Sequence, residues 1–291
     1  MTGPPYSAEL LEWARGQEDW VVALLESLAR CESPSSDPSS QLAVRALLAE
    51  AFEPLNYRVR QIPGRTSGGM LYASPRRRRR GASAQLLLGH YDTVWPTGTL
   101  ASMPFERDGN VVRGPGVFDM KGGLVMIILA LRGLRELDVV PEVTPVVFVN
   151  SDEEIGSRDS RRYIEALARR VIRAFVLEPS LGEAGRLKTA RKGIARFTVT
   201  VTGQAAHAGL EPGKGASAIL ELSHVIQRLF ELNDPGRGVT VNVGTIDGGL
   251  RPNVVAPESR AVVDVRVAGA EDARRVESAI RSLEARTPGT E

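Results

Sequence analysis

Short apolar runs alternate with longer amphipathic stretches in the first part of the chain. Apolar positions recur at helical spacing in four stretches, at residues 8–29, 41–52, 122–137 and 160–170. Three short apolar runs have the character of strands buried on both faces, at residues 85–88, 145–149 and 174–177. Because strands that alternate with helices form sheets covered by helices, the pattern predicts an α/β fold with helices on both faces of a sheet.

The pattern changes after Glu178, and the domain boundary falls near residues 184–192. Residues 195–202 alternate as a half-exposed strand does, and the following elements are a helix at 216–232, strands at 239–246 and 260–267, and a helix at 271–286. This β-α-β-β-α order is that of a ferredoxin-like unit without its last strand. We therefore expect two domains, comprising residues 1–184 and 185–291.

Composition changes this picture little. Lys plus Arg number 37 and Asp plus Glu 35, so no strong field of either sign favours a nucleic-acid or membrane partner. The single cysteine, Cys31, excludes an internal disulfide framework and a cysteine-based metal site. The first residues lack the basic region and apolar core of a signal peptide, so we expect a cytoplasmic location.

The arginine run at Arg76–Arg80 is the one local feature that could favour nucleic acid. It has no interleaved aromatic residues, and it lies between Pro75 and Gly81 directly before a strand. A solvated hairpin tip is the better interpretation.

Candidate chemistry is concentrated where apolar runs end. The residues concerned are His90 and Asp92 in LLLGHYDTV, Asp119 in GPGVFDMKGG, Glu153 and Glu154 in VVFVNSDEEIGS, and Glu178 in FVLEPS. The carboxyl ends of the strands of an α/β sheet form a common crevice. Oxygen and imidazole ligands suit zinc, so the pattern predicts a metallohydrolase with a two-metal site.

Each motif taken alone has a plain structural explanation. An aspartate can cap a strand-end histidine, Asp119 can cap the helix that follows it, and SDEE can form a solvated turn. The glycine-rich GPGVFDMKGG lacks the ending of a phosphate-binding P-loop. Their occurrence together and in this order is what favours the metal site.

The series HxDTV, GxGxxDMKGG, DEEIGS and LEPS resembles the zinc-dependent aminoacylase and carboxypeptidase family. That family includes glutamate carboxypeptidase of the carboxypeptidase G type, acetylornithine deacetylase and succinyl-diaminopimelate desuccinylase. The resemblance extends from about His90 to Arg266. It implies a zinc-exopeptidase-like catalytic domain with a mixed sheet, and an inserted ferredoxin-like lid and dimerisation domain that is incomplete here.

The resemblance also implies roles for the strand-end residues. His90 and Glu178 would bind one zinc ion, Asp119 would bridge two ions, and Glu154 would bind the second. In relatives the peptide bond after the bridging aspartate is cis.

Two further residues of this region receive roles in catalysis. Glu153 resembles the general base that takes a proton from a water between the ions, and Asp92 resembles the partner that orients His90. The implied reaction is hydrolysis of an amide bond in a small substrate that bears a carboxylate, by a carboxypeptidase G-like exopeptidase or an N-acyl-amino-acid deacylase.

Three residues of the second domain match the family's lid. His207 in GQAAHAG resembles the histidine that reaches the neighbouring subunit's site and stabilises an oxyanion, which implies a homodimer. Asn253 in RPNVVAP and Arg266 in VDVRV resemble residues that hold the substrate's carboxylate. His224 lies within a helical pattern, and we expect it to pack or to face solvent.

One expected ligand has no counterpart. Relatives continue beyond the lid, return to the catalytic domain and supply a histidine to the second zinc ion, whereas this sequence ends at Glu291 and holds only three histidines. We therefore expect a C-terminally truncated chain whose second zinc site lacks its histidine. The alternative to an active hydrolase is a catalytically impaired metal-binding or dimerisation module of the same fold.

Overall fold

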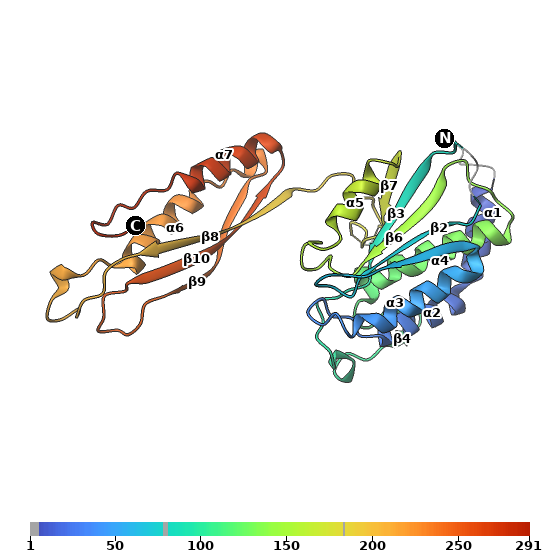
Figure 1. The fold of residues 1–291 in the computed structure, drawn as a ribbon, viewed down its shortest axis with the longest axis horizontal. Helices are drawn as coiled ribbons and strands as arrows, with labels where there is room; N and C mark the ends of the chain where they lie inside the picture. The colour runs from blue at the N-terminus through green and yellow to red at the C-terminus, as the bar shows by residue number, and fades with distance from the viewer. Residues whose placement is uncertain (1–5, 78–80, 183) are drawn as a thin grey trace. The chain divides into compact units, whose positions relative to one another are not determined.

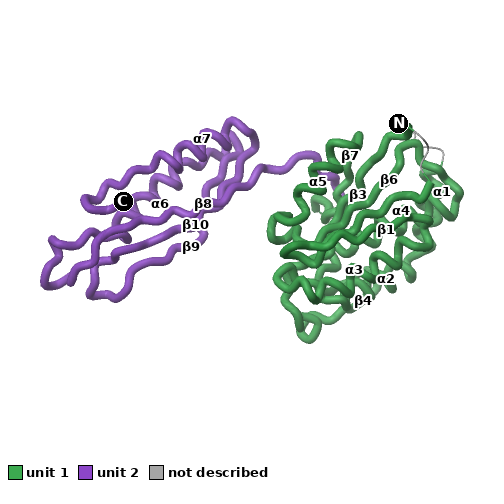
Figure 2. Tube along the Cα trace, in the orientation of Figure 1, with its two compact units in different colours: residues 1–184 green, residues 185–291 purple. Residues whose placement is uncertain are grey.

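A computed structural model describes residues 6–77, 81–182 and 184–291, which Figure 1 shows as a ribbon. The chain divides into two compact units, unit 1 (Met1–Ala184) and unit 2 (Gly185–Glu291), coloured separately in Figure 2. No helix in the described ranges is both long enough and apolar enough to span a membrane.

Unit 1 is built on a mixed five-stranded sheet with the order β1-β2-β6-β3-β7. The strands are β1 (Tyr57–Ile62), β2 (Met70–Pro75), β3 (Ala84–His90), β6 (Thr144–Asn150) and β7 (Arg173–Val176). β3 runs parallel to β6 and β7, while β1 and β2 form an antiparallel hairpin that joins β6 through β2. The predicted α/β fold with a mixed sheet flanked by helices is confirmed. The β1–β2 hairpin was not predicted.

Helices cover both faces of this sheet. Its central strand β6 is therefore buried along its whole length. Leu28, Leu48 and Ile127 pack with Val147 and Val149 on one face. On the other face, Val146 and Phe148 pack against α5. The helices are α1 (Ser7–Arg15), α2 (Glu18–Arg30), α3 (Gln41–Phe52) with the short η1 (Glu53–Leu55), α4 (Gly122–Glu136) and α5 (Arg161–Ala168).

The prediction of a single helix over residues 8–29 is wrong in one respect. This stretch forms two helices, α1 and α2, separated at Gly16 and Gln17. Glycine is a poor helix former, since it loses the most backbone freedom when it becomes helical, so the helical pattern can be interrupted there.

The expectation that β7 is buried on both faces is also wrong. All four of its residues are exposed, and the side chains of Phe175 and Val176 are 47% and 53% accessible. β7 is an edge strand, and within the described ranges it pairs with β3 alone. An apolar run shows what a strand is able to bury, but not whether a neighbour covers it.

The segments around the arginine run differ from the prediction as well. β2 and β3, which flank it, are separated in the sheet by β6, so their connection is not a hairpin. Arg76 and Arg77 follow β2, and Arg78–Arg80 lie outside the described residues. Farther along the chain, β4 (Glu106–Asp108) and β5 (Val111–Arg113) form a small separate hairpin, preceded by the short η2 (Thr99–Ala101).

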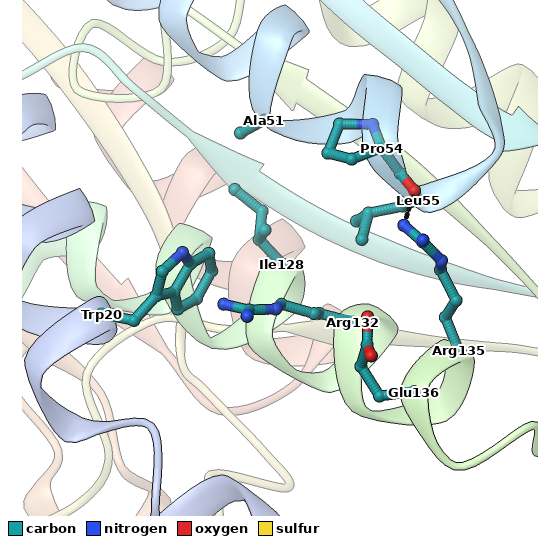
Figure 3. A pocket seen from close by; sticks show the side chains of 8 residues that line it. All are labelled: Trp20, Ala51, Pro54, Leu55, Ile128, Arg132, Arg135 and Glu136. Atoms are coloured by element: carbon teal, nitrogen blue, oxygen red, sulfur yellow. Dashed lines mark hydrogen bonds between the residues drawn. The ribbon is translucent and has the colours of Figure 1, made fainter.

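A cavity of about 280 Å³ lies among α2, α4 and η1 in the helical layer (Figure 3). The Arg132 guanidinium stacks over Trp20 at its edge, 4.5 Å from the ring centroid, and Arg135 donates a hydrogen bond to the carbonyl of Pro54. None of the motif residues at the strand ends lines this cavity.

Unit 2 has the predicted order of elements. These are β8 (Gly193–Thr202), α6 (Ala218–Phe230), β9 (Thr240–Gly248), β10 (Glu258–Val267) and α7 (Ala270–Arg281), with the short η4 (Pro212–Lys214) and η5 (Pro235–Arg237). The antiparallel sheet has the order β8-β10-β9, and Val225, Leu229 and Val276 of the helices pack against it. Glu291 exchanges two backbone hydrogen bonds with Thr202 at the end of β8.

A buried carboxylate fixes the tail of unit 2. Glu221 on α6 is 1% exposed, and its Oε2 accepts hydrogen bonds from the backbone N–H groups of Arg286 (3.0 Å) and Thr287 (2.7 Å). α7 ends at Arg281, before the predicted end at residue 286, and the backbone at Arg286 and Thr287 is held by Glu221 instead of by helical hydrogen bonds. Burial by itself would raise the pKa of Glu221, but the bonds from Thr287 and Arg286 outweigh it and lower that pKa below its ordinary value.

We expect Glu221→Gln to lower the free energy of unfolding of unit 2 by about 1–3 kcal/mol, because the amide accepts these bonds less strongly than the charge does. All three tryptophans lie in unit 1, so far-UV circular dichroism with urea should report this loss while tryptophan fluorescence does not. Because the folded-state pKa is lowered, the difference from wild type is full above pH 4.5 and shrinks as the pH falls.

Glu277→Gln is the matched control, since Glu277 forms an exposed pair with Arg281. We expect it to change the free energy of unfolding by less than about 0.5 kcal/mol. Equal effects of the two variants would contradict the role given to Glu221.

Candidate metal centre

The fold of unit 1 brings the motif residues together at one edge of the sheet. His90 is the last residue of β3, and Glu153 and Glu154 follow the end of β6 at Asn150. Glu178 lies two positions beyond the end of β7. These three strands are parallel neighbours, so their carboxyl ends meet at the same edge.

Asp119 approaches from a separate segment, the short helical turn η3 (Val117–Lys121) that precedes α4. At Asp119 and Met120 the backbone leaves helical dihedral angles, and the peptide bond between them is cis, as the resemblance implied. Gly116 makes the turn with φ 69°, a conformation that a side chain would strain.

The imidazole of His90 is the centre of the cluster. Its Nε2 lies 3.1 Å from Asp119 Oδ1, 3.3 Å from Glu178 Oε1 and 3.9 Å from Glu153 Oε2. Two sets of side chains have potential donor atoms within 4.8 Å of one another: one comprises His90, Asp119 and Glu154, and the other His90, Glu153 and Glu178. His90 therefore belongs to two adjoining groups of possible ligands.

Asp92 fixes the backbone around these groups. Its Oδ1 accepts a hydrogen bond from the Glu153 N–H and its Oδ2 accepts one from the Glu154 N–H, both at 3.2 Å. His90 Nδ1 lies 3.3 Å from Asp92 Oδ1 and 3.0 Å from the backbone oxygen of Asp92. One buried carboxylate thus connects the histidine to both glutamates.

A further contact was missed in the sequence. The hydroxyl of Ser35 donates to Asp92 Oδ2 at 2.7 Å. The stretch that holds it, CESPSSDPSS at residues 31–40, follows the helix predicted to end at residue 29 and contains none of the motifs that indicated a metal site.

The charges of the cluster favour a bound cation. Burial raises the pKa of Glu153, and the opposing effect of His90 does not cancel it. Burial and the charge of Asp119 raise the pKa of Glu154 to about 7. Burial would lower the pKa of His90, but the carboxylates, with Asp119 foremost, raise it to about 12. The site therefore holds more negative charge than one imidazolium can offset.

These residues fit a divalent metal ion. Imidazole nitrogen and carboxylate oxygens are ligands of zinc, and a cation would replace the proton that the carboxylates draw onto His90. Asp92 lies beside the other ring nitrogen, Nδ1, where it can orient His90 as a metal ligand.

The three candidates in unit 2 do not form one cluster. His207 and Asn253 are neighbours in facing loops. His207 forms an isolated antiparallel β-bridge with Val254, and the Ala208 N–H donates to the Asn253 carbonyl. Arg266 is near the far end of β10, eight residues along the strand from Glu258 or roughly 27 Å at ~3.4 Å per residue. Its guanidinium pairs with Asp264 at 2.8 Å. Within one unit 2, Asn253 and Arg266 therefore cannot hold the same carboxylate.

Comparison with known proteins identifies relatives of both units. Residues 189–287 match the family described as the peptidase dimerisation domain of M20 enzymes. Over 280 residues, 95% of the chain, the sequence is 30% identical to carboxypeptidase G2 of Pseudomonas sp. (strain RS-16). The chain belongs to the M20 metallopeptidase family. Among its relatives is also an acetylornithine deacetylase of Myxococcus xanthus, 31% identical over 219 residues, or 70% of the chain.

Solved structures share the fold of this M20 chain. The aminopeptidase PepT of Bacillus cereus matches with a TM-score of 0.73 and 20% identity, over 94% of this chain and 75% of that one. The M20 family metallo-carboxypeptidase Sso-CP2 of Sulfolobus solfataricus matches with a TM-score of 0.66 and 16% identity, over 94% and 78%. The chain spans 66% of the length of carboxypeptidase G2 and 54% of that of the deacetylase.

We expect the chain to bind Zn²⁺ with an affinity that rises with pH through about 7, because Glu154 must lose its proton to act as a ligand. Binding should release protons, including the one on His90. Isothermal titration calorimetry in buffers of different ionisation enthalpy measures both effects.

His90→Gln should abolish this binding, and His224→Gln on α6 is the matched control that removes a histidine from unit 2. Zn²⁺ binding that survives in His90→Gln and fails in His224→Gln would place the site elsewhere.

Proposed function

We propose that this M20 protein is a metal-dependent hydrolase that cleaves an amide bond in a small substrate bearing a free carboxylate, in the manner of a carboxypeptidase G-type exopeptidase or an N-acyl-amino-acid deacylase. The observation that carries the proposal is the convergence of His90, Asp119, Glu154 and Glu178 beside the carboxylate of Glu153. The similarity to carboxypeptidase G2 and to acetylornithine deacetylase supports the reaction class.

In this proposal His90 and Glu178 would hold one zinc ion, Glu154 would hold a second, and Asp119 would be a ligand of both. The ions would supply Lewis acidity to a water molecule and to the scissile carbonyl. The second ion has no histidine ligand from unit 1, because the other two histidines of the sequence, His207 and His224, belong to unit 2.

Glu153 is the proposed general base. Its carboxylate is half-exposed beside the imidazole of His90, so a water and a substrate can reach it. It would take a proton from the attacking water and deliver it to the leaving amine. Its raised pKa supports this shuttle, because a base whose pKa approaches the working pH can also return the proton.

His207 is the proposed oxyanion donor. Its Nδ1 accepts hydrogen bonds from the N–H groups of Gly209 and Leu210, each at 3.2 Å. In the neutral ring this leaves the proton on Nε2, which can then donate to a developing negative charge.

We further propose that the protein acts as a homodimer through unit 2, with Asn253 and Arg266 binding the substrate's carboxylate. Since these two residues lie at opposite ends of β10, both can serve one substrate only if the site takes them from different chains. The dimerisation-domain match of unit 2 supports this arrangement.

We expect Glu153→Gln to lower kcat for an N-acyl-glutamate substrate by roughly a hundred- to ten-thousandfold, because the amide cannot accept the proton of the water. Zn²⁺ binding should persist in this variant through the remaining ligands. Initial-rate kinetics and calorimetry on the same preparation check both statements.

Glu165→Gln, which alters an exposed glutamate on α5, is the control and should leave kcat unchanged. Zinc binding by the wild type without any turnover of N-acyl amino acids would instead favour the impaired metal-binding or dimerisation module.

The shared site predicts complementation. A His207→Ala chain and a Glu153→Ala chain should each be inactive, whereas an equal mixture of the two should recover about a quarter of wild-type activity, because half of the dimers have one intact site. Activity measured after mixing and subunit exchange tests this. No recovery, with heterodimers shown by mass spectrometry, would mean that His207 does not act across the dimer.

A further inference from the structure

A short polar segment, Ser33–Ser35, lies against the HYDT motif. Pro34 and Thr93 form a parallel bridge, in which the Thr93 N–H donates to the Ser33 carbonyl at 2.9 Å and the Ser35 N–H donates to the Thr93 carbonyl at 3.1 Å. Ser33 is fully buried and its hydroxyl donates to the Tyr91 carbonyl at 2.6 Å. The segment is thus held in register with residues 91–93.

This register places the Ser35 hydroxyl on Asp92. Ser35 is 7% exposed, and its Oγ lies 2.7 Å from Asp92 Oδ2, the same oxygen that accepts the Glu154 N–H. Asp92 Oδ1 accepts the Glu153 N–H and faces His90 Nδ1. Ser35 supplies the one side-chain hydroxyl among these contacts of Asp92.

A second buried side chain holds the same segment to the other motif. Gln41, which is fully buried, donates from Nε2 to the carbonyls of Pro34 and Ser151, each at 3.0 Å. Its Oε1 accepts the Gly68 N–H at 2.7 Å, and a Cβ at Gly68 would lie 2.3 Å from that oxygen. Segment 33–41 therefore connects the strand end that holds His90 to the strand end that precedes Glu153.

We propose that Ser35 is a positioning residue of the metal centre: its hydroxyl holds the Asp92 carboxylate in the orientation that aligns His90 and the backbone of Glu153 and Glu154 for metal binding. The proposal rests on the proposed function. A buried carboxylate with three directional donors has one preferred rotation, and removal of the shortest of these bonds lets it turn.

Ser33 provides a matched control, since it is a buried serine of the same segment with one hydroxyl bond of similar length. That bond ends on a backbone carbonyl and does not reach Asp92. Loss of either hydroxyl weakens the packing of the segment, but only loss of Ser35 Oγ frees the Asp92 carboxylate.

The experiment compares Ser35→Ala, Ser35→Thr and Ser33→Ala in the full chain. The first measurement is the dissociation constant for Zn²⁺ alone, determined by competition with a chromophoric chelator. We expect Ser35→Ala to bind Zn²⁺ about 10–100-fold more weakly, as is typical when the partner of a metal ligand loses its support. Ser35→Thr, which keeps the hydroxyl, should restore most of this affinity, and Ser33→Ala should match wild type.

The second measurement is hydrogen–deuterium exchange of the metal-free protein, read at the amides of Glu153 and Glu154. Ser35→Ala should lose protection there and Ser33→Ala should not. Unchanged zinc affinity and unchanged protection in Ser35→Ala, or equal changes in both alanine variants, would overturn the proposal. If the wild type binds no zinc while Ser35→Ala alone loses protection, the proposed function fails and the positioning of the glutamates by Ser35 stands.

Discussion

Electrostatic crowding around one buried imidazole is the constraint on which unit 1 depends. The carboxylates of Asp92, Asp119, Glu153 and Glu178 all lie within 4 Å of a His90 nitrogen. Such a cluster costs free energy unless a cation balances it, because like charges in a partly buried site repel one another and lose hydration. The parallel strands, the turn that carries Asp119 and the hydrogen bonds of Asp92 all hold this group of like charges together.

Much of this arrangement could be predicted because the information is local. Helix 41–52 was placed with its observed bounds from its apolar spacing, and His90 and Glu153 could be assigned to one edge because each follows an apolar strand. The predictions that were wrong depended on which parts of the chain lie next to one another in the fold. The pattern did not show that Gly16 would separate two helices, and it could not show that β7 has a partner on one side only. Ser35 could not be found because it belongs to none of the strand-end motifs, and nothing in the sequence places it beside Asp92.

Unit 2 shows a similar division between what sequence and structure provide. Its β-α-β-β-α order was predicted from alternation and helical spacing, and the structure has that order. The separation of Asn253 from Arg266 could not be predicted from the sequence, because a motif match shows that residues are present but not how far apart they lie. Because of the length of β10, the carboxylate clamp proposed for these two residues would need two chains.

The free side of β7 has a consequence for how the protein behaves in concentrated solution. Its backbone N–H and C=O groups on that side have no strand partner within the described ranges, and Ile172, Phe175 and Val176 add apolar surface next to them. Natural sheets usually protect such an edge with charge, proline or a covering element. Here Arg173 is the one charged residue of the strand. β7 is therefore an edge at which a strand of another molecule could add to the sheet, so this strand favours association as the protein concentration rises.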